Sequence, residues 1–408
     1  MALVVQKYGG SSVATADKIR NVAARISRKK DEGNDVVVVV SAMGKTTDQL
    51  IALARQMTDQ PDEREMDVLL STGETVSSTL MAMALKASGH PAVSLTGFQA
   101  GIRTDATYSK ARITGVEPGR IRDELARNNI VIVAGFQGFS PSLDITTLGR
   151  GGSDTTAVAL AVGLGADVCE IYTDVEGVLT ADPRIVPDAK KLTMIGYEEM
   201  LELASYGAKV MAARAVELGQ LYGMPILVAS SSTDAAGTLI CKEETMELRR
   251  KVSGIAHDTN VAKITIVGVP DHPGAARDIF APLARANVSV DTIVQNVGLD
   301  DVTDVTFTVS RTDLVKALSI VEPVSKTVGA GRISSDETLA KVSIVGTGMQ
   351  NAPGYAAKMF NALAEAGINI ELISTSEIRI TCIIAEARVA DAVRALHKEF
   401  EVEFGQSA

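Results

Sequence analysis

Over the first 240 residues, short runs of β-branched residues alternate with longer stretches that have helical apolar spacing. The short runs predict strands at residues 4–6, 36–40, 92–95, 130–134, 168–173 and 225–228. Apolar residues three and four apart predict helices at residues 16–30, 47–57, 75–88, 118–128, 155–164 and 205–221. This alternation is typical of a mainly parallel sheet covered by helices on both faces.

The chain after residue 251 contains an internal repeat, in which residues 261–293 align with residues 339–373. The matched positions include Lys263 with Lys341, Gly274 with Gly354 and Phe280 with Phe360. Each copy continues with two strands, a helix and a closing extended piece, which in the second copy falls at residues 401–404. This order, βαββαβ, predicts a ferredoxin-like unit in each copy.

A charged stretch separates the two parts and marks a linker. We expect an α/β domain at residues 1–240, a linker at 241–251, and small domains at 259–335 and 336–408. An extra strand at 252–258 belongs to neither repeat, and we expect it to complete the sheet of the second small domain.

Composition narrows the function classes. The formal charge of −10 disfavours a general nucleic-acid or anionic-membrane binder, although a local basic pocket still permits a small anionic substrate. Three cysteines form no CxxC pair and four histidines show no metal-ligand spacing, so no metal site made of side chains is predicted. The first residues lack the pattern of a signal peptide and no apolar run reaches ~18 residues, so a cytoplasmic protein is expected.

Two glycine-containing turns follow predicted strands. In KYGGSS, Lys7 precedes Gly9, Gly10 and Ser11, and backbone amides beside an ammonium group form a phosphate cradle, although a plain tight turn explains these residues equally well. In SAMGKTT, a Walker loop is excluded because residue 39 is valine where a glycine is required. Ser41 and Thr47 remain candidate hydrogen-bond donors there.

The segment TTLGRGGSDTT is the strongest local signal. Arg150 offers a guanidinium suited to a carboxylate, Gly151 and Gly152 give a flexible backbone, and Ser153 and Asp154 open a helix. An ordinary helix cap is the simpler interpretation of Ser153 or Asp154.

Further polar residues extend this candidate chemistry. Thr173, Asp174, Asp182 and Arg184 lie in or after a strand, in a loop that either holds a nucleotide or is a surface hairpin. Lys209 is either a second site cation or a solvated lysine. These groups suit phosphoryl transfer to an anionic acceptor, which needs cancellation of charge but no general base.

Together the motifs KYGGSS, GRGGSDTTA, YTDVEG with ADPR, and the two repeats resemble the aspartate kinases, members of the amino-acid kinase family with tandem ACT domains. The resemblance covers nearly the whole chain. It implies that ATP phosphorylates L-aspartate to 4-phospho-L-aspartate, the first step towards lysine, threonine and methionine. It also implies Mg²⁺ carried on the nucleotide phosphates.

The resemblance assigns roles residue by residue. The catalytic positions are Lys7, Asp154 and Lys209. The ATP-binding positions are Lys7, Gly9, Gly10, Ser11, Ser41, Thr173, Asp174, Leu179, Asp182, Arg184 and Lys209. The substrate-binding positions are Thr47, Glu74, Arg150, Gly151, Gly152 and Ser153. The chain departs from the family at Leu179, where many relatives have tyrosine, and at Ala212, Ala213 and Ala229.

For the repeats, the resemblance implies binding of lysine, threonine or both as feedback effectors. The matching positions are Asp271, Gly274, Ala276, Gln295, Asn369, Ile370, Thr375, Ser376 and Glu377. It further implies a homo-oligomer paired through the ACT domains, and Met246 would suit the start of a shorter regulatory chain. An amino-acid sensor with a decayed kinase domain, or a kinase for glutamate or acetylglutamate, remains an alternative.

Overall fold

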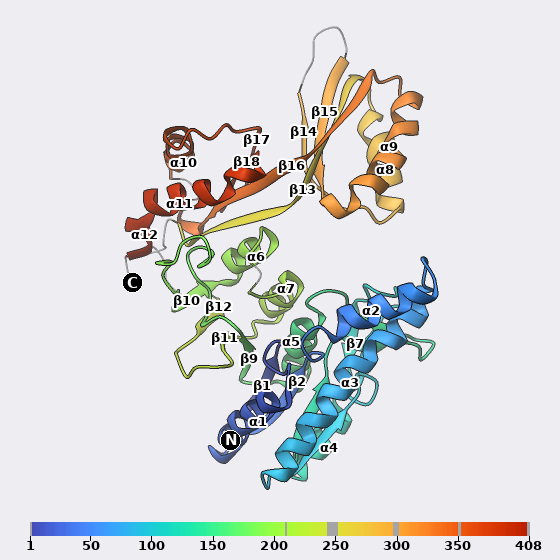
Figure 1. Cartoon of the computed structure of the whole chain (residues 1–408), viewed down its shortest axis with the longest axis vertical. Coiled ribbons are helices and arrows are strands. Elements are labelled where there is room, and N and C mark those ends of the chain that lie inside the picture. The colour runs from blue at the N-terminus through green and yellow to red at the C-terminus, as the bar shows by residue number, and fades with distance from the viewer. Residues whose placement is uncertain (1, 209, 243–251, 297–301, 350–351, 406–408) are drawn as a thin grey trace. The chain divides into compact units, whose positions relative to one another are not determined.

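A computed structural model describes residues 2–208, 210–242, 252–296, 302–349 and 352–405. Within this part the chain forms two compact units (Figure 1). The first contains residues up to 179 together with 190–247, and the second contains 180–189 together with 248–408. Residues 180–189, which the sequence analysis placed in the first domain, therefore pack with the second unit.

The first unit is built on an eight-stranded sheet in the order β10-β12-β11-β9-β1-β2-β6-β3. All neighbouring strands are parallel except β11 and β12. The strands are β1 (Leu3–Tyr8), β2 (Asp35–Val40), β3 (Ala92–Leu95), β6 (Ile130–Ala134), β9 (Val168–Thr173), β10 (Met194–Gly196), β11 (Ile226–Ser230) and β12 (Thr238–Cys241). The mainly parallel sheet predicted from the sequence is confirmed.

A second, four-stranded sheet lies in the same unit. Its order is β5 (Ile113–Val116), β4 (Ile102–Thr104), β7 (Gln137–Phe139) and β8 (Ile145–Thr147). The sequence analysis did not predict these strands. Each has only three or four residues, too few for an apolar alternation to stand out.

Helices cover both faces of the large sheet. They are α1 (Ala16–Asp31), α2 (Thr46–Met57), α3 (Glu63–Ala87), α4 (Gly119–Ala126), α5 (Gly152–Leu164), α6 (Tyr197–Ser205) and α7 (Ala213–Tyr222). Ile26 of α1 and Leu85 of α3 pack in one core with Val36, Val38 and Val40 of β2. The helix α5 contacts β1, β2 and β9 and is buried along most of its length. The valine-rich β2 is thus buried on both faces, as its sequence predicts.

Two helix predictions were wrong. The helix predicted at 75–88 begins three turns earlier, because Asp62 caps it by accepting a hydrogen bond from the Glu65 amide at 3.1 Å. The helix predicted at 205–221 begins only at Ala213, because α6 ends at Ser205 and the chain then turns at Gly207, which adopts a φ of 119°. By length and composition α3 could cross a membrane, but half of its apolar stretch is buried within the fold, as in a core helix.

The second unit is one six-stranded sheet rather than two separate ones, in the order β14-β15-β13-β16-β18-β17. Its strands are β13 (Gly254–Pro270), β14 (Val290–Gln295), β15 (Val302–Val309), β16 (Arg332–Val345), β17 (Leu372–Thr375) and β18 (Arg379–Ala385). Its helices are α8 (Ala275–Arg285), α9 (Leu314–Thr327), α10 (Tyr355–Glu365), α11 (Val389–Glu399) and α12 (Glu401–Gly405). The first repeat has the expected order βαββαβ, and the second has it up to α11.

Two long strands join the repeats. β16 closes the first repeat and continues as the first strand of the second. The extra strand of the sequence analysis is the first part of β13, where Gly254–Asp258 pair with Lys341–Val345 of β16. The expected extended piece at 401–404 is instead the short helix α12, because β13 already occupies that edge of the second repeat.

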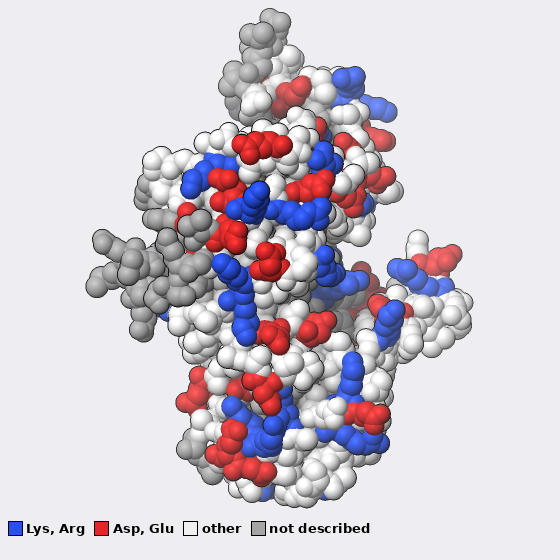
Figure 2. Space-filling model, turned by 60° about the vertical axis from the view of Figure 1, so that its left-hand side comes forward, with Lys and Arg blue, Asp and Glu red and all other residues white. Residues whose placement is uncertain are grey.

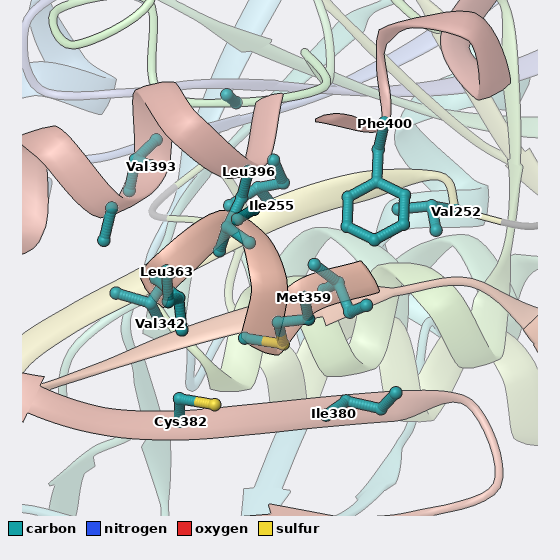
Figure 3. Packing of buried hydrophobic residues seen from close by; sticks show 14 of the residues in the cluster. Val252, Ile255, Val342, Met359, Leu363, Ile380, Cys382, Val393, Leu396 and Phe400 are labelled. Carbon is teal, nitrogen blue, oxygen red and sulfur yellow. The ribbon is translucent and has the colours of Figure 1, made fainter. Parts of the chain in front are cut away.

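The second repeat has its own core (Figure 3). In it, Ile255 of β13 packs with Val342, Met359, Leu396 and Phe400. A residue that precedes both repeats in the sequence therefore helps to fill the core of the later one.

Opposite charges are interspersed over the described surface shown in Figure 2. On that face the Lys and Arg side chains do not gather into one large patch. That face therefore offers no broad basic surface to an anion.

Ile255→Ala should lower the free energy of unfolding of the second unit by about 2–5 kcal/mol, because it leaves a cavity in a core that residues 339–400 cannot fill alone. Urea denaturation followed by circular dichroism measures this loss. Asn260→Ala, at an exposed position of the same strand, is the control. Equal stability of the two variants would show that β13 is dispensable for the second core.

Candidate functional site

The carboxyl ends of β1, β2 and β9 meet at one edge of the large sheet, because these neighbouring strands are parallel. Lys7 is the last but one residue of β1 and points to the face covered by α5, opposite to Tyr8. Its ammonium group lies 2.6 Å from the Asp154 carboxylate, and the two side chains are only 11% and 9% exposed. The other carboxylate oxygen of Asp154 accepts a hydrogen bond from the Ala212 amide at 3.1 Å. The structure thus brings together two of the three expected catalytic residues, whereas Lys209 lies outside the described residues.

The turn after β1 interlocks with the turn after β2. The Gly44 amide donates to the Gly10 carbonyl at 3.0 Å, and a Cβ on Gly10 would lie 2.8 Å from the Ala42 carbonyl oxygen. The Gly9 amide donates to the Tyr172 carbonyl of β9 at 3.3 Å, and the Ser41 amide donates to the Tyr8 carbonyl at 3.1 Å. Gly10 is therefore required for close backbone approach, and the turn that contains Ser11 is fixed beside Lys7.

The helix α5 begins in a glycine-rich turn. Gly151 adopts a φ of 72° and is the N-cap without a side-chain hydrogen bond, so the interpretation of Ser153 or Asp154 as the cap is wrong. A Cβ on Gly151 would also lie 2.5 Å from the Ala212 Cβ. Ser153 and Asp154 are buried in the first turn, and Arg150 is exposed and forms no ion pair with another described residue. The turn leaves a helix N-terminus and a guanidinium available to an anion.

The departure from the family at Ala212 preserves the backbone hydrogen bond to Asp154. Ala212 supplies a backbone N–H to Asp154, which any residue except proline provides. A small side chain at this position also suits the close approach of Gly151.

Glu74 of α3 is a buried carboxylate, only 3% exposed. One oxygen accepts a hydrogen bond from the Ala42 amide at 3.1 Å, and the other has no partner among the described residues. Burial raises the pKa of Glu74 to about 7, against the opposing effect of hydrogen bonds from the backbone amides of Ala42 and Glu74. A buried carboxylate with one oxygen unpaired is suited to a cationic ligand group such as an ammonium. Thr47, on the neighbouring helix α2, is half-buried.

The expected nucleotide positions fall in both units. Thr173 ends β9 and its hydroxyl donates to the Asp174 carboxylate at 3.0 Å, while Leu179 pairs with Lys191 in an isolated bridge. Asp182 and Arg184 belong to the second unit, where the Arg184 side chain donates to Asp182 and lowers the pKa of that carboxyl. The other first-unit positions, Gly9, Gly10, Ser11 and Ser41, lie in the two interlocked turns.

The expected effector positions lie in exposed or half-buried turns and edge strands of the second unit. Gly274 starts α8 with a φ of 104°, and Asp271 and Ala276 beside it are exposed. Gln295 ends β14, and Thr375 ends β17, the strand at the opposite edge of the sheet. Asn369 and Ile370 precede β17, and Ser376 and Glu377 follow it. The expected positions therefore form two sets at the two edges of one sheet.

Sequence reasoning missed two charged residues that support the glycine-rich turn, the half-buried Arg214 and the buried Asp67. Arg214 donates to the carbonyls of Leu148 and Ala111 at 2.8 and 2.9 Å, and burial lowers its pKa. Asp67 is fully buried and accepts hydrogen bonds from the amide and hydroxyl of Thr147 at 2.8 and 2.6 Å. Arg214 falls within the helix predicted at 205–221 without a signal for this role, and Asp67 lies in helical turns that the periodicity did not predict.

No group of three or more His, Cys, Asp and Glu side chains with metal-binding geometry occurs among the residues that the structure describes.

Comparison with known proteins yields consistent matches. The model of the amino acid kinase family matches residues 2–230, and ACT domain models match residues 263–324 and 342–400. The aspartokinase of Mycolicibacterium smegmatis is 52% identical over 98% of this chain and 96% of that protein. That of Pseudomonas aeruginosa is 52% identical over 99% of this chain and 98% of that protein.

Among solved structures, Escherichia coli aspartokinase III in complex with aspartate and ADP, in the R-state, is 26% identical. It matches with a TM-score of 0.83 over 98% of this chain and 100% of that one. The same enzyme with lysine and aspartate, in the T-state, matches with a TM-score of 0.72 at 25% identity, over 97% of this chain and 99% of that one.

Glu74→Gln should stabilise the fold increasingly as the pH rises. Between the ordinary pKa of 4.5 and about 7, the folded parent holds a proton that the unfolded chain releases, so its free energy of unfolding falls as the pH increases. The variant carries no such titrating group, so its free energy of unfolding does not fall in this way. Above pH 7 it should exceed that of the parent by an amount on the order of 3 kcal/mol. Urea denaturation at several pH values measures it, with exposed Glu32→Gln as the control. Parallel pH profiles for parent and Glu74→Gln would contradict the assignment.

Proposed function

Because this chain belongs to the amino acid kinase family and, within it, to the aspartokinases, we propose that it transfers the γ-phosphoryl group of ATP to the side-chain carboxylate of L-aspartate. A carboxylate oxygen of aspartate forms the new P–O bond while the bond between the β-bridging oxygen and the γ-phosphorus breaks. ADP and 4-phospho-L-aspartate are the products. No proton has to be removed from the acceptor, since a carboxylate is already ionised at neutral pH.

The observation that carries this proposal is the Lys7–Asp154 pair beside two interlocked glycine turns. Two anions must approach each other in this reaction, so the site has to supply positive charge where the phosphoryl group moves. Lys7 supplies it from a rigid strand, and Asp154 holds the ammonium group in one place without donating or accepting a proton in the reaction. Little water surrounds the pair, which strengthens its interaction with a phosphoryl group.

The substrate groups have matching partners. The unpaired oxygen of buried Glu74 is suited to the α-ammonium of aspartate, with Thr47 from the adjoining helix. The exposed Arg150 and the turn of Gly151, Gly152 and Ser153 are suited to its carboxylates. A neutral or weakly basic substrate would leave this arrangement of charges unused.

For ATP, we propose that Gly9, Gly10 and Ser11 contact the phosphates, and that Ser41, Thr173, Asp174 and Leu179 complete the nucleotide-binding positions in the first unit. The resemblance alone supports the same role for Asp182, Arg184 and Lys209. Mg²⁺ would neutralise charge on the phosphates. The relative solved with aspartate and ADP supports these ligands.

The regulatory proposal is feedback by lysine, threonine or both through the ACT domains, as part of a cytoplasmic pathway towards lysine, threonine and methionine. The relative solved with lysine supports an amino-acid effector. Because the two sets of expected effector positions lie at opposite edges of one sheet, pairing of those edges with another chain would complete two effector sites. A shorter regulatory chain starting at Met246 stays a proposal, since that residue lies outside the described part.

Hydroxylamine should trap an acyl phosphate as the hydroxamate when ATP, Mg²⁺ and L-aspartate are supplied, and glutamate and acetylglutamate should give little product.

Lys7→Ala should lower kcat about 10²- to 10³-fold with an unchanged circular dichroism spectrum, because it removes the positive charge that stabilises the transferred phosphoryl group. Lys86→Ala, at an exposed lysine of α3, is the control. Absence of hydroxamate from the parent would overturn the proposed function, and full activity of Lys7→Ala would remove Lys7 from catalysis.

Lysine, threonine or both should lower the activity of the parent, and Gln295→Ala or Glu377→Ala should raise the effector concentration for half-inhibition about tenfold or more. Initial rates measured against effector concentration test this. The matched control is Glu365→Ala, an exposed residue of α10 that is not among the expected effector positions. Unaltered inhibition in both variants would place the effector sites elsewhere.

A further inference from the structure

One face of α3 carries two buried carboxylates. Asp67 is fully buried and Glu74 is 3% exposed. They are seven residues apart, which is almost two helical turns, so their side chains leave nearly the same face of the helix about 10 Å apart along its axis. Glu74 has one oxygen without a described partner, whereas both oxygens of Asp67 are hydrogen-bonded. The proposed reaction leaves Asp67 without a role.

Asp67 joins α3 to the segments that flank the glycine-rich turn. Its Oδ2 accepts hydrogen bonds from the amides of Ser109 and Thr147 at 2.9 and 2.8 Å. Its Oδ1 accepts one from the Thr147 hydroxyl at 2.6 Å. The Ala111 amide donates to the Thr147 carbonyl at 2.9 Å, and a Cβ on Gly149 would lie 3.1 Å from the Ser109 carbonyl oxygen. The helix therefore fixes both the end of β8 and the segment against which the turn lies.

The helix α7 holds the turn from the other side. The Arg214 guanidinium donates to the carbonyls of Leu148 and Ala111 at 2.8 and 2.9 Å. Just before this helix, the Ala212 amide donates to the Asp154 carboxylate at 3.1 Å. Leu148 precedes the glycines of the turn and Asp154 follows them, so hydrogen bonds restrict the turn at both ends.

The exposed Arg150 lies between these anchors. Gly149 and Gly151 on either side of it have φ values of 76° and 72°, which let the backbone bend there. Because Asp67 ties the start of the turn to α3, one helix carries the Glu74 carboxylate and also fixes the backbone that presents Arg150. A helix is rigid over two turns, so the spacing between these two oppositely charged groups is restricted.

We propose that Asp67 is a positioning residue that sets the length of the amino dicarboxylate accepted by the site, and that it thereby favours aspartate over glutamate, which has one more methylene. Asp67 does not have to touch the substrate, since it acts through the turn that bears Arg150. The proposal rests on the proposed kinase function and deepens it by assigning a structural basis to the choice of acceptor.

The test compares Asp67→Ala with the parent in the hydroxamate assay without effectors. KM for aspartate should rise about tenfold, and the ratio of kcat/KM for aspartate to that for glutamate should fall about tenfold, a size typical of discrimination by one methylene. KM for ATP should stay within about twofold, because the lost hydrogen bonds release the glycine-rich turn and not the turn after β1. A merely structural role of Asp67 would lower the active fraction or the melting temperature and leave both readouts unchanged.

Asp67→Asn should restore the parental KM for aspartate and the preference for it within about twofold. The side-chain oxygen of asparagine can accept from the amides of Ser109 and Thr147, while its NH₂ group donates to the Thr147 hydroxyl. Glu63→Ala, at an exposed acidic residue one turn earlier in α3, is the matched control and should behave like the parent.

Arg214→Met tests the same turn through its second anchor. It should raise KM for aspartate and lower the preference over glutamate in the same direction, with KM for ATP unchanged. Arg55→Met, at an exposed arginine in the last turn of α2, is its control. If Asp67→Ala does not fold, Arg214→Met decides by these readouts.

A parental KM for aspartate and a parental preference in a folded Asp67→Ala overturn the proposal, and so does an equal rise in KM for ATP. Equal losses in Asp67→Ala and Asp67→Asn also overturn it, because the asparagine preserves the hydrogen bonds. A parent that forms no hydroxamate would overturn the kinase function itself. Calorimetric titration of L-aspartate and L-glutamate into the parent and Asp67→Ala then decides on positioning. A lower Kd ratio of glutamate to aspartate in the variant supports it, whereas an unchanged ratio or a parent that binds neither overturns it.

Discussion

The site depends on holding an ammonium group and a carboxylate together where little water reaches them. Lys7 reaches Asp154 only because β1 lies between β2 and β9 and because α5 begins at Gly151. A buried ion pair is a poor source of stability, since desolvation offsets much of the Coulomb energy. In the proposed function, the pair at the carboxyl edge of the parallel sheet provides the fixed positive charge that a reaction between two anions needs.

The structure of the second unit depends on strands that are continuous from one repeat into the other. β13 and β16 each run through both ACT repeats, and the second repeat has no complete sheet without Gly254–Asp258 of β13, which precede the first repeat. Ile255 enters the core of the second repeat from a position ahead of the first. Residues 180–189 add a third segment to that core, although they lie between two stretches of the first unit along the chain.

Much of the fold was visible in the sequence because the signals are local. The valines of β2, the apolar spacing of α1 and α5, and the repeat itself each specify an element without reference to its neighbours. The predictions failed where a neighbour decides the structure. Residues 401–404 form a helix because β13 occupies the strand position, and the short strands β4, β5, β7 and β8 exist only as a sheet.

For the site, the sequence alone determined which chemical groups are present: Lys7, Arg150, Asp154, Glu74 and glycines after buried strands. Only the tertiary structure decided which of them meet and in what surroundings. The pairing of Lys7 with Asp154 spans 147 residues of chain, and the raised pKa of Glu74 comes from burial by segments distant in sequence. Asp182 and Arg184 looked like part of the first domain because they follow β9 along the chain. Burial of Ala181 and Val186 in the other unit's core decided otherwise, since apolar side chains pack where a core can accept them, whatever their order in the sequence.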